Sequence, residues 1–459
     1  MYKILFPCIF VFSTFVGWTQ TPADDAATVK SIYSYALTHS QGYQWLEELT
    51  NIGGRLSGSE EADEAVQRFK AIADSMGFTT QLQEVTVPHW VRGSKEVAFA
   101  TAAGENHYFQ VCALGGSVGT PFNGITAPVV EINSFDQLQD MDSKALKGKI
   151  AFYNIPMDPS FINTFFAYSQ SVKQRYVGAL EASKKGAIAV VIRSLSATVN
   201  PYPHTGSMTY VGAPKHIPAA AISTQDAEWL TKALQTHPEL KITLKMDCEL
   251  RDSVTSHNLI ADLKGSEKPD EIILIGGHID SWDLGTGAHD DGAGCMHALE
   301  AAWLLKELNL LPKRTLRVVF FMNEEFGLNG AKTYAKFSKQ NKLHHVLALE
   351  SDAGGFSPRG ISIDAPDTIV NRIKLLRELL EPYGIHQFSQ QGSGADIGPL
   401  KNNQLVLIGM RPDNQRYFEI HHSALDVLGS VNPRELEMGS ATLASLVYLL
   451  DKLNVVIGE

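Results

Sequence analysis

The strongest constraint on the fold is a set of nearly continuous apolar segments in the last part of the chain. Those at residues 271–280, 314–325 and 346–355 each carry acidic or histidine side chains at or near their ends, and segments with helical periodicity lie at 294–309 and near 433–453. Strands that are apolar along their whole length are typical of parallel sheets with helices on both faces. We therefore predict an α/β fold in three layers (α/β/α), with a mixed, largely parallel central sheet.

The length of 459 residues exceeds one typical core, so at least two lobes are expected. Residues 125–248 have a different sequence pattern from the C-terminal part, because short strand-like segments alternate there with turn clusters and a helical segment. We predict that this stretch is an inserted β-rich domain. It separates an N-terminal part at 21–124 from a C-terminal part at 249–459.

The first twenty residues have the pattern of a secretory signal peptide. Lys3 gives a short positive start, residues 4–18 are nearly all apolar, and small residues precede a cleavage point near Thr19 or Gln20. The apolar stretch is short for a bilayer span, and no other segment reaches the roughly 18 apolar residues that a span requires. We predict that residues 1–20 are removed and that the protein is secreted or periplasmic, without stable membrane insertion. An uncleaved anchor is the alternative.

Charge and cysteine content exclude several classes of protein. The chain has 39 Lys and Arg against 50 Asp and Glu and no basic cluster, so we expect no nucleic-acid partner. Outside the signal segment, Cys112, Cys248 and Cys295 are odd in number and widely separated. They indicate neither a disulfide framework nor a thiolate zinc site.

Residues 115–119 (GGSVG) match the nucleophile-elbow pattern of serine hydrolases. That pattern requires a helix directly after the serine, whereas Thr120 and Pro121 lead into another turn. We therefore reject a serine nucleophile.

Acidic and histidine side chains gather where the apolar segments end. Ligands of open α/β sheets bind outside the carboxyl ends of the strands. Taken singly, such a histidine is more often a packed or surface residue, and an aspartate before a helix is often a cap, as Asp291 could be. Taken together, imidazoles and carboxylates without thiolates predict a site for zinc or a similar ion, with room for two ions if one carboxylate bridges. The candidates are His278, Asp280, Asp290, Asp291, Glu324, Glu325, Asp352 and His422.

Spacing suggests roles for some of them. Neighbouring residues of an extended chain point in opposite directions, so one of Glu324 and Glu325 should bind metal while the other faces substrate and water as a general base. Asp280 shares a face with His278 and is predicted to assist catalysis by holding that imidazole in one tautomer. Asp426, one helical turn after His422, could do the same or lie at the surface.

The segments GGHIDSWDLGTGAHDDGAG, MNEEFG, ESDAGG and HHSALD resemble, in this order, the motifs of the co-catalytic dizinc aminopeptidase family of clan MH, in particular its carboxypeptidase Q branch. The resemblance includes RLSGS at 55–59 and implies a zinc-exopeptidase fold whose insert is a protease-associated domain. It also implies two zinc ions per chain and a cis peptide after the bridging aspartate, between Asp290 and Asp291. The ions would be held by His278 and Asp352, by Glu325 and His422, and by Asp290 as the bridge, with Glu324 as the general base.

Further residues are assigned on the substrate side. The loop QGSGADIGP resembles the family's substrate loop, so Ser393 and Asp396 are predicted to contact the free amine of a substrate; a plain turn is the alternative. Tyr417 is predicted to stabilise an oxyanion, against the alternative of a core residue. His421 could replace His422 as the ligand.

We therefore predict an exported dizinc exopeptidase that hydrolyses short peptides or dipeptides with a free N-terminus, by metal-activated water and a glutamate base. Carboxypeptidase action on the same fold is the first alternative. A metal-free receptor-like binding protein and a single-zinc glutaminyl cyclase are the others, and a homodimer is plausible by resemblance.

Overall fold

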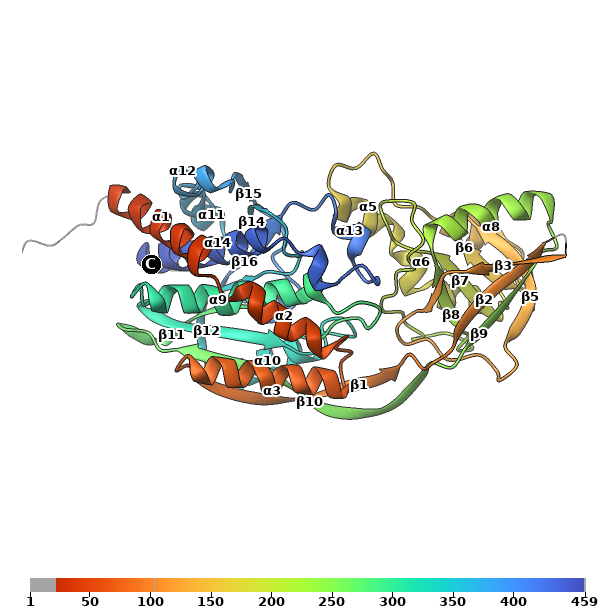
Figure 1. Cartoon of the computed structure of the whole chain (residues 1–459), viewed down its shortest axis with the longest axis horizontal. Helices are drawn as coiled ribbons and strands as arrows, with labels where there is room; N and C mark the ends of the chain where they lie inside the picture. The colour runs from red at the N-terminus through yellow and green to blue at the C-terminus, as the bar shows by residue number, and fades with distance from the viewer. Residues whose placement is uncertain (1–21, 103, 458–459) are drawn as a thin grey trace, which may run out of the picture.

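The computed structural model describes residues 22–102 and 104–457, which form two lobes side by side (Figure 1). Each lobe is built on an eight-stranded sheet. The predicted signal peptide lies outside the described residues.

The sheet of the first lobe is mixed, with a parallel centre. Strands β12, β11, β13 and β16 run parallel, whereas β1 and β10 pair antiparallel to their neighbours. Strand β14 is antiparallel to β16 and parallel to β15. In spatial order the strands are β1 (Thr79–Val91), β10 (Glu249–Leu263), β12 (Arg314–Phe321), β11 (Lys268–His278), β13 (His344–Glu350), β16 (Val406–Pro412), β14 (Pro358–Asp364) and β15 (Gln387–Ser389).

Both faces of this sheet are buried, because successive residues of the apolar strands enter different cores. Ile273 and Ile275 of β11 pack into one core with α9 and α14, whereas Leu274 packs on the opposite face against Tyr334 of α10. This arrangement gives the three layers that the apolar strands predict. The helices of this lobe are α1 (Pro22–His39), α2 (Gly42–Ile52), α3 (Glu60–Ser75), α9 (Ala293–Glu307), α10 (Asn329–Gln340), α11 (Asp367–Lys374), α12 (Arg377–Leu380), α13 (Tyr417–Ile420) and α14 (Pro433–Lys452).

The second lobe has its own sheet and two small cores, one on each face of the central strands. Its strands, in spatial order, are β3 (Glu105–Phe109), β2 (Glu96–Ala102), β9 (Lys241–Met246), β5 (Ile125–Ile132), β6 (Ile150–Tyr153), β7 (Ala189–Arg193), β8 (Ala219–Ile222) and β4 (Val111–Ala113). Its helices are α4 (Phe135–Asp140), α5 (Thr164–Ser171), α6 (Lys173–Tyr176), α7 (Gly178–Lys184) and α8 (Thr224–Thr236).

Two features of this lobe differ from the predicted insert at 125–248. Its sheet already begins with β2, because Ala98 and Ala100 pack into the second lobe's core and β2 pairs with β9. The helices α4 to α8 also make the lobe mixed α/β rather than β-rich. The relationship of the second lobe to protease-associated domains stays a prediction.

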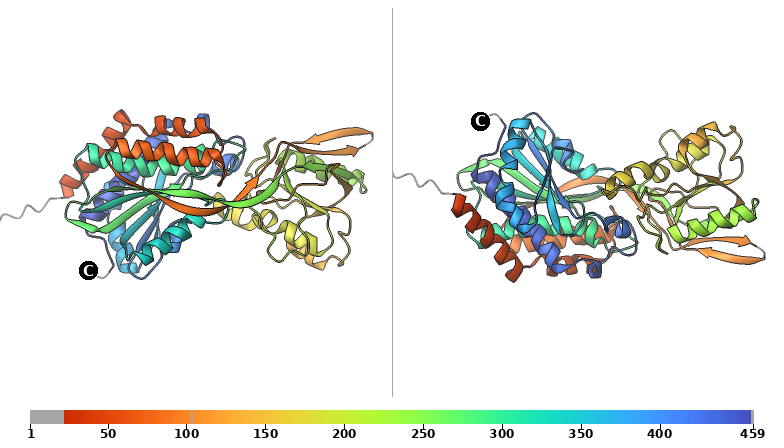
Figure 2. Two further views of the ribbon diagram at one scale, coloured as in Figure 1. Left: turned by 90° about the horizontal axis from the view of Figure 1, so that it is seen from below. Right: turned by 90° about the horizontal axis from the view of Figure 1, so that it is seen from above.

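The lobes are joined by the strands β1 and β10, a long twisted pair that runs from the first lobe into the second (Figure 2). They also share an apolar cluster, in which Ala167 and Leu195 of the second lobe meet Phe356 and Phe418 of the first. Within residues 22–102 and 104–457, no helix combines the length and apolar character needed to cross a membrane.

Candidate metal centre

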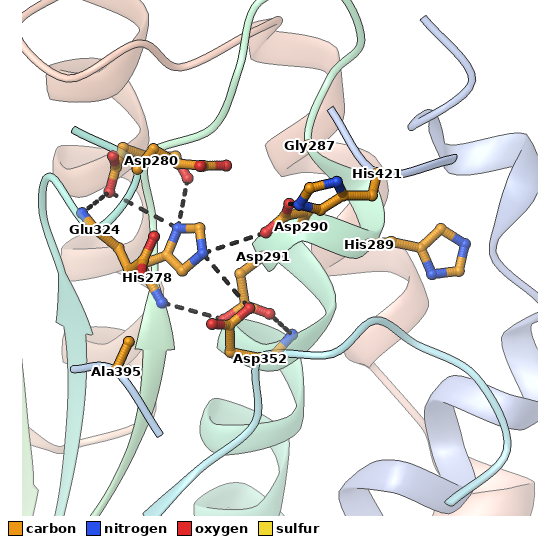
Figure 3. Close-up of polar contacts among 12 residues, drawn as sticks. His278, Asp280, Gly287, His289, Asp290, Asp291, Glu324, Asp352, Ala395 and His421 are labelled. Carbon is orange, nitrogen blue, oxygen red and sulfur yellow. Dashed lines mark hydrogen bonds and ion pairs between the residues drawn. The ribbon is translucent and has the colours of Figure 1, made fainter. Parts of the chain in front are cut away.

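Four predicted site residues stand where neighbouring parallel strands end, as Figure 3 shows for three of them, His278, Glu324 and Asp352. His278 is the last residue of β11, Glu324 and Glu325 follow β12, and Asp352 follows β13. Because β11 lies between β12 and β13 in parallel register, these side chains reach the same edge of the sheet. The sequence pattern of apolar strand and terminal acid therefore places them together, as expected for ligands of an α/β sheet.

The other two predicted ligands come from loops of the same lobe. Asp290 lies in the turn Ala288–Gly292, directly before α9, with a non-helical backbone (φ −118°, ψ 92°). The peptide between Asp290 and Asp291 is cis, as the resemblance implies. His422 follows α13 and has a φ of 61°.

The first half of the centre, which we call the His278 position, consists of His278, Asp290 and Asp352. Nε2 of His278 lies 3.3 Å from Oδ1 of Asp290 and 3.7 Å from Oδ1 of Asp352. The three ligand atoms fall within 4.8 Å of one another, a spacing that one metal ion can bridge.

The second half, the His422 position, consists of Asp290, Glu325 and His422. Nε2 of His422 lies 3.0 Å from Oε2 of Glu325 and 3.2 Å from Oδ2 of Asp290. Nε2 of His421 reaches the same Asp290 oxygen at 3.7 Å, and its ring stacks on His422 at 3.5 Å between centroids. Contact with both carboxylates favours His422 over His421 as the ligand, although both imidazoles are close enough to group with Asp290.

Asp290 belongs to both halves, since its two oxygens face different imidazoles. Burial alone would disfavour its charge, but the close imidazoles of His278 and His422 hold the pKa of this carboxyl well below its usual range. Oδ2 of Asp290 and Oε1 of Glu325 are buried and accept no hydrogen bond from the described residues. Buried carboxylate oxygens without a donor are costly unless a cation binds them, so the donor set fits a bridged pair of divalent ions.

Asp280 acts differently from the prediction. The Nδ1 of His278 lies 2.9 Å from the backbone oxygen of Asp280, whereas the nearer carboxylate oxygen is 3.8 Å away. The carbonyl thus fixes the tautomer, with Nε2 free for a metal. The Asp280 carboxylate instead accepts the backbone N–H groups of Asn323, at 2.6 Å, and Glu324, at 3.1 Å. It positions the turn that carries Glu324.

Two further aspartates hold the frame of the centre. Asp291 caps α9 by accepting the N–H of Gly294 at 3.0 Å, and it also accepts the N–H of His278 at 3.1 Å. The cap alternative is therefore correct for Asp291. Asp426 is buried rather than at the surface, and it accepts the N–H groups of His289 and Asp290 instead of supporting His422.

Glu324 is half-buried beside the ligands and joins neither half. Burial raises its pKa well above the usual range, and the negative charges of Asp352, Glu325 and Asp396 add to that rise against the opposing effect of His278. Metal cations among these carboxylates would reduce the repulsion and favour the charged form that accepts a proton.

The centre opens into a cleft of about 540 Å³ that both lobes line. From the first lobe come Glu324 and Tyr417, and from the second come Tyr168 and Arg175. Arg175 is largely buried; its guanidinium lies over the ring of Tyr168, and its Nε has no hydrogen-bond partner among the described residues. The lining of the cleft thus combines a cation with a group of carboxylates.

The three predicted substrate residues have different places. Tyr417 lines the cleft. Ser393 lines a neighbouring cavity of about 430 Å³, which shares Asp352 with the cleft. Asp396 has no exposed surface and lines neither cavity, so its contact with the substrate amine stays a prediction. Glu350 accepts the N–H groups on either side of Asp396, at Ala395 and Ile397, and so fixes this turn against the sheet.

Sequence reasoning missed Arg175, Trp282 and Glu350. Nε1 of Trp282 donates to Oε2 of Glu325 at 2.6 Å, so this ring orients a predicted ligand. Trp282 lies within the recognised motif GGHIDSWDLG, which was a usable signal. Arg175 stands in a segment without metal-ligand residues, and no pattern in the sequence separates it from surface arginines.

The serine of the rejected nucleophile motif has no catalytic surroundings. The Ser117 hydroxyl donates to the Val118 carbonyl and accepts the N–H of Ala219. No helix follows it before β5.

Comparisons with known proteins agree with this geometry. The model of peptidase family M28 matches residues 258–447. Carboxypeptidase Q of Homo sapiens is 35% identical over 93% of this chain and 89% of its own length. The crystal structure of a peptidase M28 precursor from Shewanella amazonensis superimposes with a TM-score of 0.89 at 36% identity, over 94% of this chain and 97% of that chain.

A zinc aminopeptidase from Bacillus subtilis has a similar fold, with a TM-score of 0.64 at 21% identity over 89% of this chain and 94% of its own. These relatives cover both lobes and not the metal-binding half alone. The chain therefore belongs to peptidase family M28, as its motifs predict, and is a metallopeptidase.

Proposed function

We propose that the chain is an exported exopeptidase with two zinc ions, which hydrolyses dipeptides and other short peptides with a free N-terminus. The observation that carries this proposal is the pair of ligand groups that share Asp290 at the base of the cleft. His278 and Asp352 would hold one ion, and Glu325 and His422 the other. The family implies zinc, and the imidazole and carboxylate donors fit that metal.

Zinc, when bound, lowers the pKa of water and polarises a carbonyl oxygen. Glu324 is placed to accept the proton of the attacking water and to return it to the leaving amine, since it lines the cleft without ligating. The Asp280 carboxylate keeps Glu324 in position by accepting the backbone N–H of Glu324.

The charges that line the cleft suggest why a short substrate would fit. A free amine is attracted to the carboxylates around Asp352, while Arg175 can pair with the carboxylate at the other end of a dipeptide. When His422 binds metal through Nε2, its Nδ1 carries a proton and donates to the Thr205 carbonyl, 3.3 Å away. Arg175, 3.3 Å from that Nδ1, then has no acceptor there and is free for the substrate.

Export is part of the same proposal. It is supported by the charged start at Lys3 and the apolar run at residues 4–18. Expression of the full chain with its N-terminus intact, followed by mass determination of the exported product, would give the cleavage position. A product that keeps Lys3 would contradict a cleaved signal peptide.

The activity is tested with the zinc-supplemented protein on four substrates: a free dipeptide, its N-acetyl form, its C-terminal amide and a longer peptide. The variant Glu324→Gln is the control. Cleavage of the free dipeptide alone would identify a dipeptidase that reads both termini. N-terminal cleavage of the amide and the longer peptide as well would identify a general aminopeptidase. Loss of the C-terminal residue from the acetylated form would establish carboxypeptidase action instead. No turnover that depends on Glu324 would contradict the proposal.

A further inference from the structure

The two halves of the metal centre differ in the source of the groups that support their ligands. In the His278 position, the carbonyl of Asp280 holds the imidazole and Asp291 holds the backbone N–H of His278. Both supporting residues belong to the first lobe, close to the ligand in sequence. This half is therefore complete within one lobe.

The ligand His422 is held by residues of the second lobe. The N–H of Thr205 donates to the His422 carbonyl at 2.9 Å, and the Thr205 carbonyl lies 3.3 Å from Nδ1 of His422. Nδ1 of His204 lies 2.7 Å from the His421 carbonyl and donates to it. His204 is itself fixed, since its backbone N–H donates to Ser194 Oγ at 2.8 Å in the second lobe. The loop at 204–205 thus contacts both backbone and ring of the segment at 421–422.

These contacts matter because His422 adopts a strained backbone conformation. Its φ of 61° lies in the left-handed region, which a residue with a side chain rarely occupies without support from its surroundings. The second lobe provides that support.

The ligand Glu325 depends on the second lobe through Trp282. The indole N–H donates to Glu325, and the indole ring packs directly on Gly115 of the second lobe, where a Cβ atom would lie 1.8 Å from Cη2 of Trp282. Gly115 in turn donates its N–H to the carbonyl of Gly206 at 3.0 Å. One surface of the second lobe therefore contacts His422 directly and Glu325 through Trp282.

We propose that the second lobe fixes the ligands of the His422 position but not those of the His278 position. The metal ion of the His422 position then binds tightly only while the second lobe contacts His422 and Trp282. The His278 position binds its ion without help from the second lobe. This inference rests on the proposed centre of two zinc ions. It makes His204 and Trp282 positioning residues, which act on metal affinity through His422 and Glu325. Loss of such supporting hydrogen bonds typically weakens metal binding about 10- to 100-fold.

The test measures zinc affinity, not turnover, in two backgrounds that isolate the halves. Asp352→Asn removes a ligand of the His278 position, and Glu325→Gln removes a ligand of the His422 position. Each background then receives Trp282→Phe or His204→Phe, and the dissociation constant is measured by competition with a chromogenic chelator. Trp303→Phe is the matched control, because Trp303 packs against Trp45 and Tyr35 in the first lobe.

With Asp352→Asn, both the Trp282 and the His204 variants should weaken zinc binding about 10- to 100-fold, and with Glu325→Gln they should change it less than about 3-fold. His204→Asn, which keeps a donor near the Nδ1 position, should recover most of the loss caused by His204→Phe. Equal weakening in both backgrounds, or no weakening in either, would overturn the inference. Thermal unfolding of each variant excludes misfolding as the cause.

A second measurement needs no background substitution. Cobalt(II) titration of the apo form should show two binding steps, of which Trp282→Phe weakens only one. If the unmodified chain binds fewer than two ions, the two-metal proposal itself fails, and the inference fails with it. That result is distinguishable because it is obtained with the unmodified chain, before Trp282 or His204 is changed.

Discussion

The two lobes contribute to the site in different ways. The first lobe supplies the six side chains assigned to the metal ions and to the general base. The second supplies none of these, yet it lines the cleft with Arg175 and holds the backbone of His422. The proposed catalytic groups thus lie at strand ends of one lobe, and the proposed recognition of substrate and support of the ligands come from a second surface that packs against them.

Removal of zinc should have the largest effect on activity and stability, because the first lobe supplies all the proposed metal ligands. A strong chelator should abolish peptidase activity and lower the melting temperature, because crowded carboxylates lose their cations. A zinc ion at a free concentration of 100 times its dissociation constant stabilises the folded protein by about 2.7 kcal/mol, and removal of each ion should cost that amount. Activity assays and thermal unfolding before and after zinc is restored would check this. Full activity in the chelated protein would contradict a metal-dependent first lobe.

Glu324→Gln should lower kcat about 10²- to 10⁴-fold, because the amide cannot accept a proton from water. The zinc content should not change, since Glu324 is not assigned as a ligand. The exposed Glu267, on the same lobe, provides the control variant Glu267→Gln, with a side chain that is 62% exposed. Steady-state kinetics combined with metal analysis distinguishes the roles, and loss of zinc from Glu324→Gln would make it a ligand.

Arg175→Met tests the second lobe's part in recognition. It should lower kcat/KM for a free dipeptide roughly 30-fold, since an ion-assisted hydrogen bond contributes about 1.5–3 kcal/mol. The C-terminal amide of the same dipeptide should be cleaved at a nearly unchanged rate, because it has no carboxylate to pair. An equal loss on both substrates would assign Arg175 a structural role instead.

A smaller effect concerns a histidine of the first lobe away from the cleft. Burial lowers the pKa of His345 to about 3, and its ring nitrogens bond to Tyr334 and Ser338. The unfolded chain takes up a proton below about pH 6.5 while the folded form stays neutral, so stability is complete above that pH and declines as pH falls towards 3.

His345→Gln should remove this share of the acid sensitivity, about 2 kcal/mol between pH 8 and pH 5, with kcat unchanged. Urea unfolding at the two pH values measures the difference. The same pH dependence in both proteins would show that His345 does not stay neutral when folded.

Much of the first lobe could be predicted from sequence, because each element carries its own signal. The strand around Ile273 to Ile275 is apolar on both faces, and His278, Glu324 and Asp352 follow such strands directly. Parallel register then brings them together without knowledge of side-chain packing.

The parts that sequence did not predict depend on contacts between distant segments. Asp280 was expected to hold His278 through its carboxylate, but its backbone carbonyl does so, and chain spacing does not distinguish the two. Asp396 turned out to be buried because Glu350 fixes its loop. The start of the second lobe at β2 depends on pairing with β9, far along the chain.

Two zinc ions bridged by Asp290 can be tested directly by a crystal structure of the zinc-loaded protein with anomalous diffraction at the zinc edge. Two peaks are expected on either side of Asp290, one beside His278 and Asp352 and the other beside Glu325 and His422. A single peak, or two peaks that do not share Asp290, would contradict the bridged pair.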